Sequence, residues 1–501
     1  MNIWRRIGAI ILALILIAGS VFVIYAFLHT YPLPRRNYIP TSDPPRQETS
    51  ECNSSTFIRG DQDLDNENES DHDPEPSATV PVSQAEELKT GESRSEITST
   101  QIGAQYEAII DQLLMSLATK RLPEQQGPPV LERYGSLGHS PVLVLPSDQT
   151  SVKQIKEVIH ESLLAGETSI KLDDVIKEFE FTDIHTGTTT VNRWLSELKL
   201  ADPRLFFIDA LSFVDESGET QRGFTYQYSY ENTATGIRFT RFTLESGLKE
   251  SYADPVNREN AYVQLSAVAD QIAAAIAAAT DNDYARLRLI HDFLIVIADY
   301  DETETIANNN AYSCLLDGTT MCVGYSQAFD MIARRLGFES RVISGKTRSR
   351  DGLEVMHAWN KVLLYDHWYN VDVTWDDQAG LPTFSESHHT WFLCSDTFFA
   401  HDHTPNETMQ PDAPLDFLDF YYLNGLCATN EEQLLAILVE QLREPVDGAP
   451  PLIEFIVEFD LKKETFAQLA EQAYHYSFML SGVKWSYHLH YGRGFCYYSL
   501  T

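Results

Sequence analysis

Residues 322–337 read CVGYSQAFDMIARRLG, and this stretch decides how the central part of the chain folds. Its apolar side chains recur at helical spacing on one face, and Gly337 stands where such a helix would end. Cys322 would therefore begin a buried helix. Because aligned backbone dipoles place roughly half a positive charge at a helix N-terminus, a thiol there is favoured as the thiolate that attacks carbonyl carbon. An inert buried cysteine at a helix start is the alternative interpretation.

A β-hairpin is predicted downstream of this helix. The segments 357–364 (HAWNKVLL) and 368–375 (WYNVDVTW) have strand-like composition, and a turn is expected at residues 366–367 between them. We expect Leu364 to pair with Tyr369, which fixes the faces of the other residues in the two strands.

In this register His357 shares a face with Asp372 and lies directly opposite Asp376. A histidine and a carboxylate on one face suit a general base and its orienting group. Together with a thiolate at Cys322 they would form the Cys-His-Asp version of the nucleophilic triad. Spacing alone does not choose between the two carboxylates.

The motifs around these residues resemble those of the bacterial transglutaminase-like superfamily. The match lies in YSCLLDGTTMCVGYSQAF (312–329) and HAWNKVLLYDHWYNVDVTWDD (357–377), which agree with the family in order, spacing and flanking residues. The resemblance covers about 285–405, from an entry helix containing LIHDFLIVIADYD to the trailing segment WFLCSDTFFAHDH.

This resemblance implies an α+β catalytic domain with a papain-like core, in which a cysteine-bearing helix packs on an antiparallel sheet that supplies His and Asp. It makes Cys322 the nucleophile, His357 the base and later the acid, and Asp372 rather than Asp376 the orienting carboxylate. The family needs no metal and no cofactor. Its members include transglutaminases, peptidases and deglycosylating amidases, so the acceptor, an amine or water, is left open.

Neighbouring residues carry further hypotheses. Trp359 and Trp375 flank the triad and could wall a dry acyl-binding cleft, although aromatic residues on a sheet face are as often plain core, and Tyr325 is equally open. Cys314 is the main alternative nucleophile. Several side chains near the end of the family segment could in principle bind zinc, but their spacing fits no common site: His388, His389, Cys394, His401 and His403.

The N-terminal part predicts a membrane anchor. Residues 7–28 (IGAIILALILIAGSVFVIYAFL) carry no charge, and a helix of that length crosses a hydrocarbon core of about 30 Å. A cleaved signal peptide is the alternative. Arginines stand on both sides of the span, but the short preceding segment and the acidic residues that follow favour an outward-facing body.

The chain of 501 residues is too long for one hydrophobic core, and we expect five parts. They are the anchor region 1–40, a disordered acidic stalk 41–104, an α+β accessory domain 105–255, the catalytic domain 256–410 and a C-terminal α/β accessory module 411–501.

Composition limits the partners. Asp and Glu outnumber Lys and Arg by 73 to 37, so the formal charge is −36 and a nucleic-acid partner is not expected. We interpret the chain as a single-pass protein of the cell membrane whose extracytoplasmic body acts on amides of a peptide or protein, with hydrolysis slightly favoured over crosslinking. A non-catalytic cell-surface binding module on the same fold is the alternative. The oligomeric state does not follow from the sequence.

Overall fold

The computed structural model describes residues 62–63, 99–118, 120–126, 150–209, 211–214, 220–301, 308–348, 354–377, 388–406, 411–415, 418–443, 450–479, 483–490 and 492–499. These residues belong to one compact unit, residues 60–501. The predicted membrane span at 7–28 and nearly all of the predicted stalk at 41–104 lie outside the described residues.

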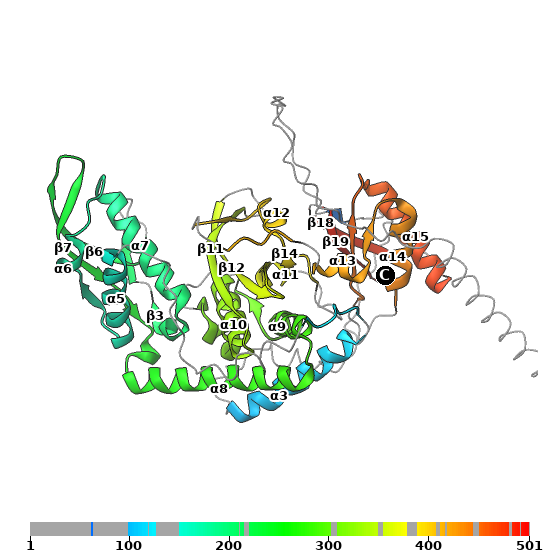
Figure 1. Ribbon diagram of the computed structural model, residues 1–501, viewed down its shortest axis with the longest axis horizontal. Helices are drawn as coiled ribbons and strands as arrows, with labels where there is room; N and C mark the ends of the chain where they lie inside the picture. Colours follow the sequence, from blue (N-terminus) through cyan, green and yellow to red (C-terminus); the bar gives the residue numbers. More distant parts are fainter. Residues whose placement is uncertain are drawn as a thin grey trace, which may run out of the picture. The chain divides into compact units, whose positions relative to one another are not determined.

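An antiparallel sheet of five strands, in the order β14-β13-β12-β11-β15, organises the domain predicted to be catalytic. Helix α10 (Cys322–Arg335) packs on β11 and β12, and α9 (Asp283–Ile297) packs on α10 (Figure 1). Gly337 follows the last turn of α10 with a φ of 88°, a conformation that favours glycine. This combination of helices and antiparallel sheet is the α+β architecture expected from the sequence. The strands are β11 (Ser340–Arg348), β12 (Glu354–Leu364), β13 (His367–Val371), β14 (Phe392–Cys394) and β15 (Thr404–Pro405).

The register of the β12–β13 hairpin differs from the prediction. Leu364 pairs with His367 and not with Tyr369. The turn consists of Tyr365 and Asp366, which both have positive φ (50° and 65°), as a two-residue turn matched to the strand twist requires. The turn prediction at 366–367 is wrong because a tyrosine at positive φ is unusual and gives no local signal.

The second strand of the hairpin is also shorter than predicted. β13 ends at Val371, and the next residues form the helical turn α11 (Val373–Asp376). Asp376 therefore does not lie in a strand opposite His357. Asp372 stands between the two elements as the N-cap of α11.

The long helix α8 (Pro255–Ala279) runs past the other helices of this domain. It packs against α3 (Ser99–Leu117), α9 and α10, and Tyr106 of α3 donates a hydrogen bond to the carbonyl of Leu315 (2.6 Å). Within the described residues, α8 is the one helix long and apolar enough to span a membrane, judged by length and composition. It is an internal core helix with Leu265 and Ile272 fully buried, so it does not test the predicted anchor at 7–28.

Residues 150–254 form a small α+β region. Helices α5 (Thr150–Ala165) and α7 (Ile184–Ala201) pack on each other beside a three-stranded sheet of order β2-β7-β6 (Figure 1). The two longest strands of this region are β6 (Thr225–Asn232) and β7 (Ile237–Glu245). Its remaining elements are β2 (Ser169–Lys171), α6 (Asp173–Ile176), η2 (Pro203–Phe207), β3 (Ile208–Asp209), β4 (Leu211–Val214), β5 (Thr220–Gly223), β8 (Gly247–Leu248) and η3 (Glu250–Tyr252).

The C-terminal part contains a second five-stranded sheet, in the order β1-β18-β19-β17-β16. Helices α14 (Glu431–Gln441) and α15 (Lys463–Phe478) pack on each other, and α14 packs on β16 and β17. The strands are β1 (Gln62–Asp63), β16 (Cys427–Ala428), β17 (Ile453–Val457), β18 (Lys484–His490) and β19 (Arg493–Ser499). The remaining short elements are β9 (Asp299–Tyr300), η5 (Ser313–Asp317), β10 (Thr319–Thr320) and α12 (Asp396–Phe399) in the domain predicted to be catalytic, and α13 (Phe420–Asn424) before β16.

Candidate active site

Cys322 is the first residue of α10, as predicted, and is 7% exposed. Met321 provides no side-chain cap for this helix, and the carboxamide oxygen of Asn309 accepts hydrogen bonds from the amides of Val323 (2.8 Å) and Gly324 (3.2 Å) instead. Among the described residues no acceptor takes the amide of Cys322 itself. Both the thiol and the amide of Cys322 therefore lie at the N-terminus of α10, where the backbone dipoles favour negative charge.

His357 lies on β12, and its ring contacts both other predicted triad members. Its Nε2 is 2.6 Å from Oδ2 of Asp372, and the Cys322 thiol also interacts with the ring. Burial alone would lower the pKa of His357. The negative charge of Asp372, the hydrogen bond to it and the contact with Cys322 outweigh burial and raise that pKa to about 10.

Asp372 is buried, with 1% of its surface exposed, and its position comes from both neighbouring elements. Oδ1 accepts a hydrogen bond from the amide of Trp375 (3.2 Å) in α11, while its own amide donates to the carbonyl of Trp391 (3.0 Å) beside β14. Burial alone would raise the pKa of Asp372, but the charge and hydrogen bond of His357 lower it, with a further hydrogen bond from His403. The carboxylate is therefore ionised and aimed at the imidazole.

The structure thus brings Cys322, His357 and Asp372 together, and it adds a residue that the triad prediction did not contain. His403 Nε2 lies 3.1 Å from Oδ2 of Asp372, the same oxygen that His357 binds. In the sequence His403 stands out as the last residue of the trailing family-like segment and as one of the possible zinc ligands, and neither pattern gives a direction for its ring.

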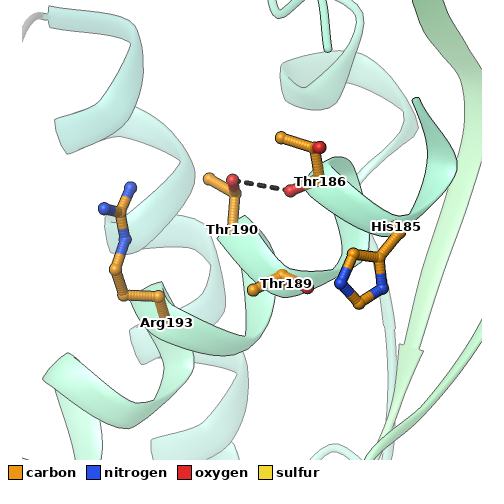
Figure 2. A pocket seen from close by; sticks show the side chains of 5 residues that line it. All are labelled: His185, Thr186, Thr189, Thr190 and Arg193. Carbon is orange, nitrogen blue, oxygen red and sulfur yellow. Dashed lines mark hydrogen bonds between the residues drawn. The ribbon is translucent and has the colours of Figure 1, made fainter. Parts of the chain in front are cut away.

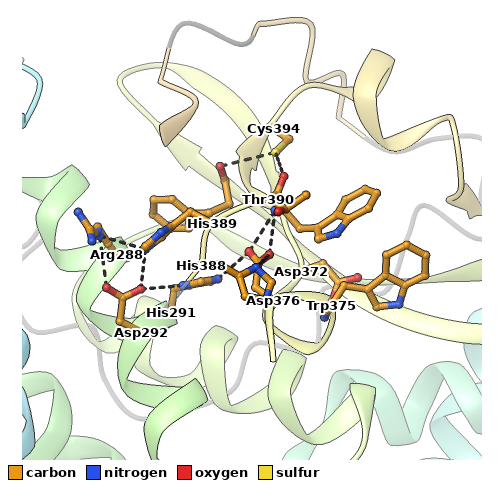
Figure 3. Close-up of polar contacts among 12 residues, drawn as sticks. Arg288, His291, Asp292, Asp372, Trp375, Asp376, His388, His389, Thr390 and Cys394 are labelled. Carbon is orange, nitrogen blue, oxygen red and sulfur yellow. Dashed lines mark hydrogen bonds and ion pairs between the residues drawn. The ribbon is translucent and has the colours of Figure 1, made fainter. Parts of the chain in front are cut away.

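Asp376, the other candidate carboxylate, belongs to a buried polar network with His291 and His388 (Figure 3). Its carboxylate accepts hydrogen bonds from the amide of Trp391 (3.1 and 3.0 Å) and from Nε2 of His291 (3.0 Å), and Nδ1 of His388 lies 3.0 Å away. Burial alone would lower the pKa of His291, but hydrogen bonds to Asp292 and Asp376 raise it to about 9.

The same network continues into the C-terminal sheet. Asp292 Oδ1 is 2.9 Å from His291 Nδ1 and 3.0 Å from His389 Nε2. His389 in turn binds Glu454 of β17, through its amide (2.7 Å) and through Nδ1 (3.1 Å). Arg493 of β19 donates to the carbonyl of Thr390 (3.2 Å). Residues of the C-terminal module therefore hold the segment 389–391, which contacts both Asp372 and Asp376.

Aromatic rings surround the imidazole of His357. The ring of Trp359 is stacked at 6.2 Å between centroids and that of Trp375 lies at 5.8 Å. Trp359 is 2% exposed and belongs to a small core cluster with Trp391 and Phe399, and a part in an acyl-binding cleft stays a prediction. Tyr325 is fully buried and donates to the carboxylate of Asp377, which explains it as a structural residue.

The remaining cysteines and histidines of the sequence hypotheses separate into different environments. Cys314 is fully buried in η5, so it is less accessible than Cys322. Cys394 lies 2.7 Å from Nη1 of Arg493. His401 interacts through Nδ1 with the carbonyl of Phe398 (2.9 Å). The five residues considered for zinc therefore do not converge on one site.

Two other groups of side chains bring three ligand-type atoms within 4.8 Å of one another: His357, Asp372 and His403, and His291, Asp292 and His389. In the second group the guanidinium Nε of Arg288 lies 3.2 Å from His389 Nε2 and 3.3 Å from Asp292 Oδ2, so a positive charge already stands beside these atoms. In the first group an ion would separate His357 from Asp372. Both arrangements fit hydrogen-bonded networks better than metal sites.

A cavity of about 240 Å³ lies elsewhere, on the surface of α7 (Figure 2). Its lining consists of residues from one face of that helix: His185, Thr186, Thr189, Thr190 and Arg193. None of these side chains contacts the triad, so this cavity is separate from the candidate active site.

Comparison with known proteins supports the family resemblance. Residues 270–373 match the family model described as the transglutaminase-like superfamily, a region that contains Cys322, His357 and Asp372. No curated protein matches the chain.

Solved structures that resemble the chain cover only part of it. One is a candidate cysteine protease from Cytophaga hutchinsonii (13% identity, TM-score 0.20, 33% of this chain and 66% of the other). Another is described as a TGase (16% identity, TM-score 0.22, 32% and 48%). A candidate protease from Parabacteroides distasonis is a third (11% identity, TM-score 0.16, 33% and 41%). The chain therefore spans less than two thirds of the length of each.

Proposed function

Because the chain contains a domain of the transglutaminase-like superfamily, we propose that it is a thiol-dependent acyl-transfer enzyme acting on peptide or protein amides. Cys322 is the nucleophile, His357 the base and acid, and Asp372 the group that orients His357. The observation that carries this proposal is the 2.6 Å hydrogen bond between His357 and the buried carboxylate of Asp372, on an imidazole that also interacts with the Cys322 thiol.

The first half-reaction transfers the acyl group to the enzyme. The Cys322 thiolate attacks the carbonyl carbon and forms a C–S bond, and the negative charge moves to the carbonyl oxygen. The amide of Cys322, which no acceptor takes among the described residues, is a suitable donor to this oxyanion. When the C–N bond breaks, the imidazolium of His357 gives its proton to the departing amine, and a thioester remains.

The second half-reaction releases the acyl group. Neutral His357 takes a proton from the acceptor, whose oxygen or nitrogen attacks the thioester, and the C–S bond breaks to restore the thiolate and imidazolium. We place water ahead of an amine as the acceptor, because water is small enough to reach the largely buried Cys322 without dedicated binding groups. Peptide hydrolysis is thus the favoured reaction and crosslinking the second.

Digestion of a peptide library, with and without an added primary amine, tests the proposal directly. Mass spectrometry should show cleaved peptides in both samples and few amine adducts, and Cys322→Ser should show neither product. Adducts in place of cleavage would identify the amine acceptor. No product with the native chain, together with no enhanced reactivity of Cys322 towards iodoacetamide, would support the binding-module alternative.

The location of the enzyme is proposed from the sequence. We infer that residues 7–28 anchor the chain in the cell membrane with the catalytic body outside. Protease added to intact cells should then release a soluble body by cutting between about residues 40 and 105. Full protection of the body from the protease would contradict this topology.

A further inference from the structure

We propose that His403 is a positioning residue for the reaction. It donates a second hydrogen bond to the Asp372 carboxylate and so weakens the attraction between that carboxylate and the proton of His357. This inference rests on the proposed function, because it concerns the same triad. It assigns a role to a side chain that lies outside Cys322, His357 and Asp372.

The two imidazoles share one oxygen atom. Asp372 Oδ2 is 2.6 Å from Nε2 of His357 and 3.1 Å from Nε2 of His403, and the two ring centroids are 5.5 Å apart. The other oxygen, Oδ1, accepts from the amide of Trp375. Because the carboxylate is buried, these side chains and this amide take the place of the water that would otherwise solvate it.

The fold brings His403 to this point through a close approach of two strands. The β15 residue Pro405 and the β12 residue His357 both pair with Gly345 of β11, from opposite sides. A Cβ atom at Gly345 would lie only 2.4 Å from the carbonyl oxygen of Thr404, so only glycine permits this spacing. The amide of His403 donates to the carbonyl of Phe399 (2.8 Å), which fixes the backbone before β15.

The surroundings of His403 keep its ring neutral. Four aromatic rings surround it at centroid distances of 4.6 to 5.1 Å: Trp359, Trp375, Trp391 and Phe399. Burial lowers the pKa of His403, and the charge of His357 lowers it further, against the opposing effects of Asp372 and Asp402. Nδ1 has no hydrogen-bond partner among the described residues.

A neutral ring carries one proton, and the nitrogen that faces an ionised carboxylate must hold it. His403 is therefore an Nε2–H donor to Asp372. The groups facing His357 are Asp372, Cys322 and His403. Without the second donor, the full charge of Asp372 would act on His357 and bind its proton more tightly. Sharing the carboxylate lets His357 release that proton to the leaving amine while it stays oriented.

Carboxymethylation of Cys322 by iodoacetate measures this effect in the full chain. The imidazolium attracts the anionic reagent, so the rate should fall as His357 loses its proton near pH 10. Two variants of similar size distinguish loss of the hydrogen-bond donor from loss of the side chain's shape. His403→Gln carries an N–H near the position of Nε2, and His403→Leu carries none. In His403→Leu we expect this fall in the carboxymethylation rate to occur at a pH on the order of one unit higher than in the native chain. His403→Gln should stay close to the native chain.

The ratio of the rates at pH 10.5 and pH 8 gives the result without a full titration, and thermal unfolding shows whether each variant folds. A severalfold higher ratio in His403→Leu alone supports the proposal. Equal ratios in both variants and the native chain, or a downward shift, would overturn it and leave a packing role only. If His403→Leu does not fold, His403→Asn replaces it, because its shorter amide does not reach Asp372.

The same experiment separates this inference from the proposed function. If Cys322 of the native chain reacts no faster than the other cysteines, the proposed triad fails, and the role of His403 fails with it. If Cys322 is selectively reactive but the His403 variants leave the pH at which the rate falls unchanged, only the role of His403 is refuted.

Discussion

Replacement of each candidate carboxylate by its amide distinguishes the orienting group from the residue that merely lies near it. Asp372→Asn and Asp376→Asn both remove one buried negative charge at nearly constant shape. They differ in what they leave behind, because Asp372 contacts the imidazole of His357, and Asp376 contacts His291 and the amide of Trp391.

The expected loss follows from the contacts of Asp372. Its two oxygens accept from three donors, namely His357, His403 and the amide of Trp375. An asparagine has one acceptor oxygen and turns an N–H towards a donor. The pKa of His357, about 10 against an ordinary 6.5, shows how strongly its charged form is stabilised, and each unit is worth about tenfold. We therefore expect Asp372→Asn to slow alkylation of Cys322 on the order of 30-fold at pH 8, where an ordinary imidazole has lost most of its proton and that of the native chain has not.

Asp376→Asn should change the same rate by less than about tenfold, while it lowers the free energy of unfolding by roughly 2 to 4 kcal/mol, because a buried charge network loses one member. The assay is iodoacetamide labelling with peptide mapping, which separates Cys322 from the other cysteines, with Cys322→Ser as the blank. Urea unfolding of each variant reports stability. A larger rate loss for Asp376→Asn than for Asp372→Asn would refute the assignment.

Three further outcomes are expected. The pKa of His291 is raised to about 9, so the stabilisation by its charged form is complete below about pH 6.5 and is lost as the pH rises through 9. The difference in free energy of unfolding between the native chain and His291→Gln should therefore shrink by about 3 kcal/mol between pH 6 and pH 10. A constant difference would contradict this. Gly345→Ala should lower the unfolding temperature, since its Cβ would meet the carbonyl of Thr404, and unchanged stability would show that β15 moves freely. Glu454→Gln should cost about 2 kcal/mol in urea unfolding by removing the charge beside His389, and no loss would show that this pair is not charged.

The parts of the site that depend on local periodicity could be predicted from the sequence. Helical spacing identified α10 and put Cys322 at its first position. Strand-like composition beside a turn identified the strand that carries His357. Both signals come from residues within one element, where side-chain direction follows directly from the backbone period.

The choice of carboxylate depended on geometry that the pattern does not contain. In the predicted register, with Leu364 opposite Tyr369, a regular ladder would have put Asp376 opposite His357. The ladder ends at the pair Asn360–Val371, and Asp372 then caps α11, so its side chain turns towards His357 from a helix terminus. The motif resemblance favoured Asp372 because it reflects the folded arrangement, whereas a strand register reflects only the assumed regular continuation.

The role of the C-terminal module could not be predicted, because its contacts with the site join residues far apart in the chain. The amide of Asp372 pairs with the carbonyl of Trp391, and the segment before Trp391 is held by Glu454 through His389. The backbone of residues 389–391, which is held by contacts outside the hairpin, can keep the Asp372 carboxylate in place beyond the end of the β12–β13 ladder. The orientation of Asp372 therefore depends on β17 as well as on β13, and a buried chain of alternating acids and histidines supplies the connection.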